Sequence, residues 1–193
     1  KSSWRHLIVR LRARHIVENG VEEAALRRLG LSCEVRPMIF DVPDGLEVSY
    51  EPSERPHVFM NAHPGSEDAY VVNYLLGIAA SVPHCWFHVY GVDGESHENV
   101  IFHGEVPSAQ FDEEIKGYAA GLRLNAFDGF SEVVSKSVLL GQWPISARIK
   151  YPHITFAPDA LSLIAALNDL TNKKKPNREG RNYWKRTLED SLN

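Results

Sequence analysis

Short apolar stretches that could be buried strands alternate with runs of helical periodicity along most of this chain. The segment from Asn99 to Ser146 shows the alternation most clearly. It predicts, in order, a strand at Asn99–His103, a helix opening at Pro107-Ser108, a strand at Leu122–Ala126, a helix at Ser131–Leu140 closed by Gly141, and a strand at Trp143–Ser146. Near-continuous apolar strands separated by helices are typical of a parallel sheet covered on both faces. We therefore expect an α/β fold with a Rossmann-like, doubly wound and mostly parallel sheet.

Similar units flank this segment on both sides. The expected elements are strands at 14–17, 32–40, 57–62 and 85–90, helices at 21–29, 66–79 and 158–170, a polar loop at 172–181 and a terminal helix at 183–192. Two prolines between Glu51 and Pro56 mark a boundary loop. We therefore divide the chain into a joining segment at 1–50, a Rossmann-like domain at 51–171, and a polar loop with a C-terminal helix at 172–193.

The bulk properties exclude several classes of protein. With 193 residues, 44% of them hydrophobic and 24% charged, the chain can bury the core of an ordinary globular domain. A formal net charge of −4 gives no electrostatic reason to expect nucleic acid as a partner. No apolar run approaches the roughly 20 residues that span a bilayer, and no signal-peptide pattern is present. We expect a cytoplasmic protein, with any peripheral attachment to a membrane made through parts outside this chain.

The spacing of cysteines and histidines gives no support for a metal site. Cys33 and Cys85 lie in apolar, strand-like contexts, which favours buried free thiols over a disulfide. Four scattered histidines have no metal-site spacing, and we interpret them as structural or surface residues: His84, His88, His97 and His153. The chain also lacks a P-loop, a GxGxxG motif and a nucleophile elbow, which disfavours nucleoside triphosphatases, dinucleotide dehydrogenases and serine hydrolases.

An acidic residue followed by glycine lies between a predicted strand and a predicted helix, in the sequence Asp128-Gly129-Phe130-Ser131. Ligands of doubly wound sheets bind at the carboxyl ends of the strands. Backbone N–H groups and the positive end of the helix dipole would face a diphosphate placed there, and Gly129 lets the backbone approach it closely. Asp128 could accept hydrogen bonds from sugar hydroxyls. The alternative is that Asp128 is only a helix cap and Gly129 only a turn residue.

From about Val58 to Leu170, the order of elements and several motifs resemble the donor-binding half of GT-B fold glycosyltransferases, specifically the retaining glycosyltransferase group 1 family. That family usually shows NV.F.G.V, then an acidic residue before Gly-Phe-Gly, a second Glu eight residues after the first, and G.PVI. This chain has NVIFHGEV from Asn99. Further along, the residues that correspond to the family motifs are Asp128, Gly129, Phe130, Gly141 and Pro144-Ile145. Ser131 replaces the second glycine.

Lys136 stands where the family has its second glutamate, which reverses the charge at the position that usually holds the ribose. Lys136 could pair with a nucleotide phosphate instead, or Glu132, one helical turn earlier, could face the same cleft. A third possibility is that Lys136 is an exposed residue with no role. The apolar spacing of the predicted helix leaves both Glu132 and Lys136 on its more polar side.

The loop at 61–67 departs from the family as well, because it lacks the Arg and Lys that usually clamp the donor diphosphate. Ser66 and the amides after Gly65 could still bind phosphate at a helix start, and His63 could supply partial charge, although a structural role for His63 is the alternative. Gly91 matches a glycine-containing loop near the nucleotide. His103 matches the segment whose backbone usually lines the base.

The resemblance implies a glycosyltransferase that moves sugar from a nucleotide-diphosphate sugar to an acceptor with retention, as in polysaccharide or glycoconjugate biosynthesis, without metal or other cofactor. Asp128 would orient the sugar or phosphate, the amides of Gly129–Ser131 would hold the diphosphate, and Glu132 or Lys136 would contact ribose or phosphate. The segment 1–50 would connect to an N-terminal domain that holds the acceptor glycan, lipid or protein. Since the chain begins at Lys1 without methionine, we expect it to be a fragment.

Two other interpretations stay open at this point. The missing Arg and Lys and the presence of Lys136 favour a non-catalytic glycosyltransferase-like module that binds a partner or a glycan. The second of these interpretations is an unrelated Rossmann-like binding domain whose match to the family motifs is coincidental.

Overall fold

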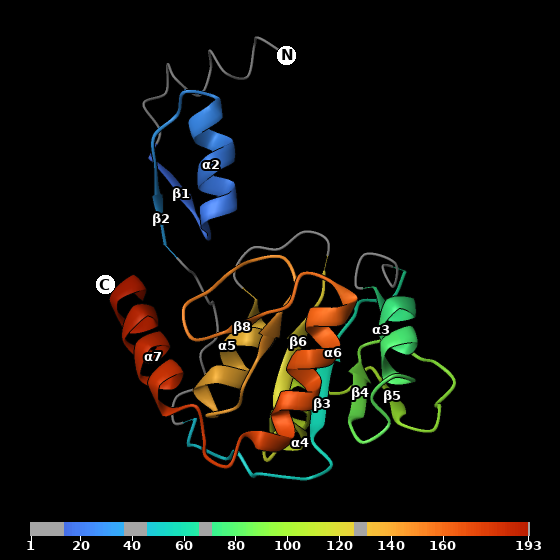
Figure 1. The fold of residues 1–193 in the computed structure, drawn as a ribbon. Coiled ribbons are helices and arrows are strands. Elements are labelled where there is room, and N and C mark those ends of the chain that lie inside the picture. The colour runs from blue at the N-terminus through green and yellow to red at the C-terminus, as the bar shows by residue number, and fades with distance from the viewer. Residues whose placement is uncertain (1–13, 37–45, 66–70, 126–130, 193) are drawn as a thin grey trace.

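A computed structural model of the chain describes residues 14–36, 46–65, 71–125 and 131–192 (Figure 1). The predicted site residues Ser66, Asp128, Gly129 and Phe130 lie outside these ranges. No helix in the described part of the chain is long and apolar enough to cross a membrane.

The central element is a six-stranded sheet in which every described pairing is parallel, in the order β5-β4-β3-β6-β7-β8. Its strands are β3 (His57–Asn61), β4 (Trp86–Tyr90), β5 (Val100–Gly104), β6 (Ala120–Arg123), β7 (Ile145–Ser146) and β8 (Thr155–Phe156). The chain runs outward from β3 to β5, returns to β6 beside β3, and runs outward again to β8. The predicted α/β fold with a doubly wound parallel sheet is confirmed.

Helices cover both faces of this sheet. Helices α3 (Val72–Ala79) and α6 (Ala160–Asp169) pack on one face, where they form a common apolar cluster with Val58 and Met60. Helices α4 (Ser108–Glu114) and α5 (Glu132–Leu139) cover the other face, where Phe59 and Tyr90 point. Adjacent strand residues therefore contribute to opposite faces of the sheet, as the pleat requires.

Strand β6 begins two residues before the predicted strand at Leu122–Ala126. Its first residues are Ala120 and Gly121, which pair with Val58 and Phe59 of β3. A Cβ at Gly121 would lie 2.9 Å from a methyl group of Val133 and 3.0 Å from the Phe59 ring. The close packing of α5 against the sheet thus requires a small residue that strand propensity alone disfavours.

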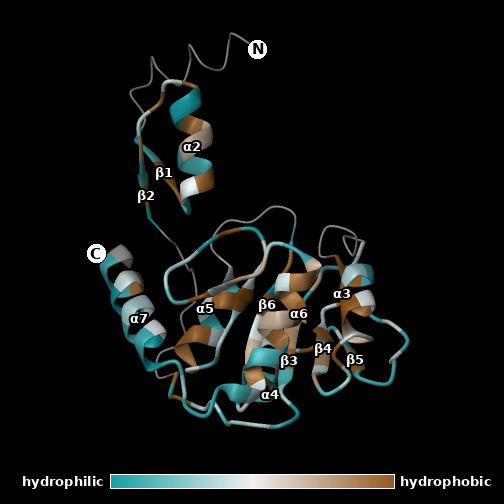
Figure 2. Cartoon of the chain, in the orientation of Figure 1, coloured by the Kyte–Doolittle hydropathy of each residue, from teal (hydrophilic) through white to brown (hydrophobic). Residues whose placement is uncertain are grey.

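Helix α7 (Arg178–Leu192) packs on α5, with Trp184 and Leu188 in a cluster that includes Val134 and Val138. Figure 2 shows α5 mostly in hydrophobic colours and α7 mostly in hydrophilic ones, as expected for a helix that covers a buried one. The predicted loop at 172–181 was wrong at its end, because α7 already begins at Arg178. The Asn177 side chain accepts a hydrogen bond from the Gly180 N–H at 3.0 Å and starts the helix there.

The N-terminal residues form a unit of their own (Figure 1). Strands β1 (His15–Val17) and β2 (Cys33–Val35) pair in parallel, and α2 (Gly20–Arg28) connects them. The side chain of Asn19 caps α2, but the helix buries none of its residues. Both cysteines are free. Cys85 is buried as predicted, whereas Cys33 is only half-buried.

Candidate functional site

The carboxyl ends of β3 and β6 lie side by side where the path of the chain across the sheet reverses. Asn61 ends β3 and the half-buried Arg123 ends β6. Nη1 of Arg123 donates to Oδ1 of Asn61 at 3.5 Å, and in the amide orientation that satisfies both groups Asn125 accepts from Nη1 and Nη2 at 3.3 Å. Such a switch point is where doubly wound folds bind ligands, so Arg123 brings a permanent positive charge to it.

A cleft of about 460 Å³ opens at the neighbouring strand ends, lined by Pro64, Gly91, Val92, Asp93 and Glu105. The predicted site residue Gly91 is one of the residues that line this cleft. Gly91 has a φ of 85°, its N–H donates to the Gly104 carbonyl at 2.7 Å, and a Cβ there would lie 2.2 Å from the Ala62 carbonyl oxygen. Only glycine fits such an approach, which holds the ends of three strands together.

The β3–α3 connection brings two more predicted residues to this edge. His63 is exposed, with Nδ1 3.4 Å from the Pro64 carbonyl oxygen, and Gly65 has a φ of 75°. Pro64, which lies between them, lines the cleft together with Gly91, whereas His63 and Gly65 are not among the lining residues. The carboxylates of Asp93 and Glu105 give the cleft lining a negative charge, which the sequence analysis did not anticipate.

His103 lies on β5 next to Gly104, which ends the strand, two residues before the cleft residue Glu105. Its imidazole points under α4 instead, where it stacks on the Tyr90 ring at 4.3 Å and lies 2.8 Å from a ring nitrogen of His88. The His103 imidazole is therefore not available to a ligand in the cleft, and a backbone contact of His103 with a nucleotide stays a prediction.

Ser131 is the N-cap of α5, and its Oγ accepts a hydrogen bond from the Val134 N–H at 3.4 Å. The alternative in which Asp128 caps this helix is wrong, because the cap position is occupied three residues later. Glu132 follows in the first turn, where a carboxylate complements the helix dipole, and its side chain is 54% exposed. Glu132 is thus the acidic residue of α5 that solvent and ligands can reach.

Lys136 is buried, with only 6% of its side chain exposed. Its Nζ lies 2.8 Å from the Asp112 carboxylate of α4 and 2.7 Å from that of Glu132. The prediction that the helix presents Lys136 on a polar side was wrong, as was the possibility of an exposed lysine without a role. The sheet, α4 and α7 surround α5, so every residue from 133 to 139 is buried.

Burial lowers the pKa of Lys136, but the hydrogen bonds to Asp112 and Glu132 outweigh this effect and hold the pKa above its usual value. The ammonium therefore stays charged, with two carboxylates already bound. Asp112 was missed by sequence reasoning, since nothing in its helix signals a buried partner. Arg123 was missed too, although a lone arginine in the apolar run before Asp128 was a usable signal.

Comparison with solved structures relates this geometry to a known architecture. Sucrose-phosphate synthase from Thermosynechococcus elongatus matches 92% of this chain and 55% of its own, with a TM-score of 0.71 at 15% identity. The HepE protein of Anabaena, in complex with UDP and glucose, matches 90% of this chain and 58% of its own, with a TM-score of 0.64 at 12% identity. The fold is that of the GT-B glycosyltransferases.

The chain also matches a GT-B domain whose structure was solved on its own. The C-terminal domain of a glycosyl transferase group 1 family protein from Francisella tularensis matches 70% of this chain and 93% of its own, with a TM-score of 0.51 at 11% identity. The resemblance expected from the sequence motifs is confirmed. This chain spans a little more than half the length of the first two GT-B structures. No protein-family model and no curated protein matches its sequence.

Proposed function

We propose that this chain is the donor-binding part of a glycosyltransferase, which holds a nucleotide-diphosphate sugar at the junction of β3 and β6 and transfers the sugar with retention. Its GT-B fold supports this proposal, and so does the likeness to a protein whose structure holds UDP and glucose. The acceptor glycan, lipid or protein would be held by a domain outside this chain.

The observation that carries the proposal is the position of Arg123. Its guanidinium lies at the switch point, held by Asn61 and Asn125, at the end of the strand that leads toward the N-terminus of α5. Arg123 would therefore supply the cation that the 61–67 loop lacks. A planar guanidinium can bind phosphate oxygens in a bidentate manner, which a histidine at the same edge cannot do.

In the transfer step, the bond between the anomeric carbon and the diphosphate oxygen breaks, the acceptor hydroxyl oxygen forms a new bond to that carbon, and the hydroxyl proton passes to the departing diphosphate. Negative charge builds on the departing diphosphate. Arg123 and the amides before α5 would stabilise this charge, and the bound geometry would bring the reactants together. The proposal needs no metal ion, since the charge comes from side chains and backbone.

The other predicted residues take roles consistent with their positions. Asp128 would orient the sugar, the amides of 129–131 and of Gly65 and Ser66 would contact the phosphates, and Gly91 and the His103 backbone would border the nucleotide. Glu132 would contact the ribose. Lys136 would then act through Glu132, which it holds at 2.7 Å, and would not contact the donor itself.

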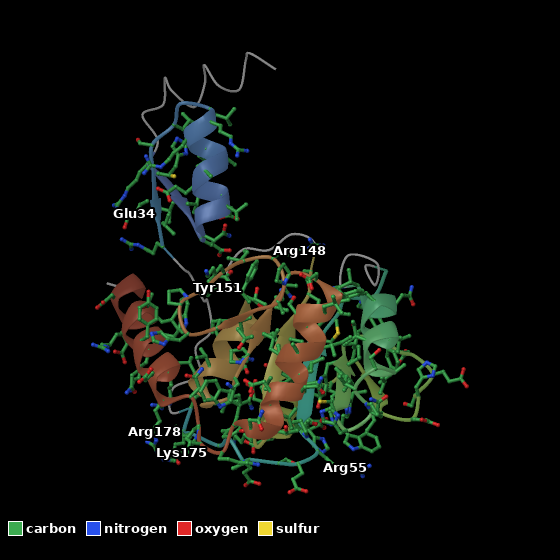
Figure 3. The ribbon with its side chains drawn as sticks, in the orientation of Figure 1. Glu34, Arg55, Arg148, Tyr151, Lys175 and Arg178 are labelled. Carbon is green, nitrogen blue, oxygen red and sulfur yellow. The ribbon has the colours of Figure 1, made fainter. Side chains whose placement is uncertain are left out.

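Isothermal titration of the full chain with UDP, GDP and their sugars tests the proposal. We expect one of them to bind with millimolar to high-micromolar affinity, about −4 to −6 kcal/mol. Arg123→Met should weaken this binding at least about tenfold, because a charge-assisted phosphate contact is lost. Arg55→Met is the matched control. Arg55 is an exposed arginine before β3, at the opposite end of the sheet strands from Arg148, which follows β7, as Figure 3 shows.

Equal weakening by Arg55→Met and Arg123→Met would refute the role of Arg123. Failure of every nucleotide to bind at millimolar concentration would refute the donor site itself. The second candidate function, a non-catalytic glycosyltransferase-like module, would then remain. The acidic lining of the cleft by Asp93 and Glu105 favours it, because these carboxylates suit the hydroxyls of a neutral glycan better than a diphosphate.

A further inference from the structure

Three histidines from three adjacent strands form a continuous row on the sheet face beneath α4. They are His57 of β3, His88 of β4 and His103 of β5, which are far apart in sequence and meet only through the strand register. Nδ1 of His57 lies 2.8 Å from Nε2 of His88, and Nδ1 of His88 lies 2.8 Å from Nε2 of His103. The rings stack with centroid distances of 5.1 Å at both contacts. We call this set the histidine row.

The row ends at a carboxylate of α4. Nδ1 of His103 lies 3.6 Å from Oε2 of Glu114. The same oxygen accepts a hydrogen bond from the Tyr90 hydroxyl at 2.9 Å, and Oε1 accepts one from Gln110 at 2.7 Å. Tyr118, in the connection after α4, lies 3.2 Å from both Nδ1 of His88 and the Tyr90 hydroxyl. The titratable groups that face the row in the described residues are therefore Tyr90 of β4, Glu114 of α4 and Tyr118.

The carboxylate determines where the protons of the row lie. Each contact between two imidazoles needs one N–H and one bare nitrogen, so all three rings must carry their proton on Nδ1 or all three on Nε2. With protons on Nδ1, His103 presents an N–H to Glu114. With protons on Nε2, a bare nitrogen lone pair would face the negative carboxylate. The Nδ1–H form is therefore favoured throughout the row.

The same geometry limits how many protons the row can bind. One extra proton fits on Nε2 of His57, at the outer end, without breaking a contact. A second would set N–H against N–H at one of the two 2.8 Å contacts and bring two imidazolium rings close together. Burial lowers the pKa of His57, and burial together with the neighbouring histidines lowers that of His88 to about 3, which agrees with this limit.

Helix α4 has no fully buried residue, whereas α3, α5 and α6 each bury apolar residues against the sheet. Phe111 packs beside Phe59 and Tyr90, and the polar contacts of Glu114 supplement that apolar contact. The segment leading into α4 includes Gly104 and Glu105, and Glu105 lines the cleft. A change in how α4 is held would therefore reach the cleft edge.

We propose that the histidine row is an acid-sensitive latch: it holds α4 on the sheet with no extra proton or one, and it opens when a second proton binds. The inference does not depend on which ligand the cleft takes. In the sequence His88 looks like an isolated structural histidine. In this proposal it is the central member of the histidine row, whose contacts limit how many protons the row binds.

Imidazole ¹⁵N–¹H spectra of the full chain at pH 7.5 test the proton positions. His57, His88 and His103 should all show the Nδ1–H tautomer, whereas the exposed His97 and His153 serve as internal references that should favour Nε2–H, as free imidazole side chains do. The Nε2–H tautomer in all three row histidines would overturn the assignment.

Amide hydrogen exchange tests the latch. Between pH 7.5 and 4.5, after correction for intrinsic exchange, α4 should lose at least about tenfold of its protection while α6 keeps its own. Glu114→Gln should reduce α4 protection already at pH 7.5 and mix the tautomers. Glu113→Gln, the same change at an exposed neighbour on α4, should leave both unchanged. Equal loss in α4 and α6 on acidification, or no effect of Glu114→Gln, would refute the proposal.

Discussion

The two faces of the sheet are built from alternate residues of the same strands, yet they are held in different ways. On the α3 and α6 face, side chains such as Val58, Met60 and Leu163 form a buried apolar cluster. On the α4 and α5 face, the histidine row and the Lys136 ion pairs lie beside Phe59. Apolar burial is non-directional and insensitive to pH, whereas the polar contacts need particular protonation states. Although the second face also has an apolar cluster, we expect its stability to depend on pH more than that of the first.

The largest expected effect is a truncation on the apolar face. Leu163 of α6 is fully buried, so Leu163→Ala should lower the free energy of unfolding by about 2–5 kcal/mol through lost burial and a cavity. The loss should be the same at pH 5 and pH 8 in urea titrations. Leu161→Ala on the same helix, where the leucine is 82% exposed, should cost about 0.5 kcal/mol or less. A marked pH dependence of the Leu163→Ala effect would break the contrast between the faces.

An intermediate effect is expected from the ion pairs on the other face. Lys136→Met leaves Asp112 and Glu132 without their cation and should cost about 2 kcal/mol, less than for a fully buried pair because both carboxylates are partly exposed. Lys136→Glu would restore the residue usual in the group 1 family but would bring three carboxylates together, so it should destabilise more. Lys116→Met, at an exposed ion pair, is the control. A stable Lys136→Glu variant would contradict the arrangement.

The smallest effect is the pH dependence of stability that His88 contributes. Its folded pKa of about 3 lies below the ordinary value of about 6.5, so between these values the unfolded chain binds more protons than the folded one. The contribution of a neutral His88 to the free energy of unfolding is therefore fully present above pH 6.5 and is lost as the pH falls toward 3. We expect a loss of about 1–2 kcal/mol from pH 7.5 to 5.0 in wild-type protein.

His88→Gln should flatten this decline, and His97→Gln at an exposed position should not. Urea titrations at pH 7.5, 6.0 and 5.0 for the three proteins provide the measurement. A wild-type curve that rises on acidification would show that His88 gains a partner for its charged form, the reverse of the arrangement described here.

The contrast between the faces also explains what could be predicted from the sequence. Apolar periodicity within one segment located the strands and helices of the sheet, because each strand carries its own pattern. The start of β6 was predicted two residues too late because Ala120 and Gly121 have low strand propensity. The small size of Gly121 matters only through its packing against Val133 and Phe59. The GT-B resemblance was recognisable from the motifs around Gly129 and Gly141.

The polar site features depend on neighbours from other elements. His57 and His88 are 31 residues apart and His88 and His103 are 15 apart, so only the register of three parallel strands reveals the row. The burial of Lys136 was not predicted because its partner Asp112 belongs to another helix. Arg123 became a site candidate only when the sheet order put β6 next to β3. Spacing along a single segment contains none of this information.

The two free thiols differ in a way that is useful for biophysical work. Burial raises the pKa of Cys85 to about 12, so this thiol is protonated and shielded at neutral pH. Cys33 lies half-buried on β2 of the N-terminal unit. A maleimide dye should therefore attach at one position without any engineered cysteine. Fluorescence anisotropy of that dye would then report on the N-terminal unit and not on the sheet, because Cys85 stays unlabelled.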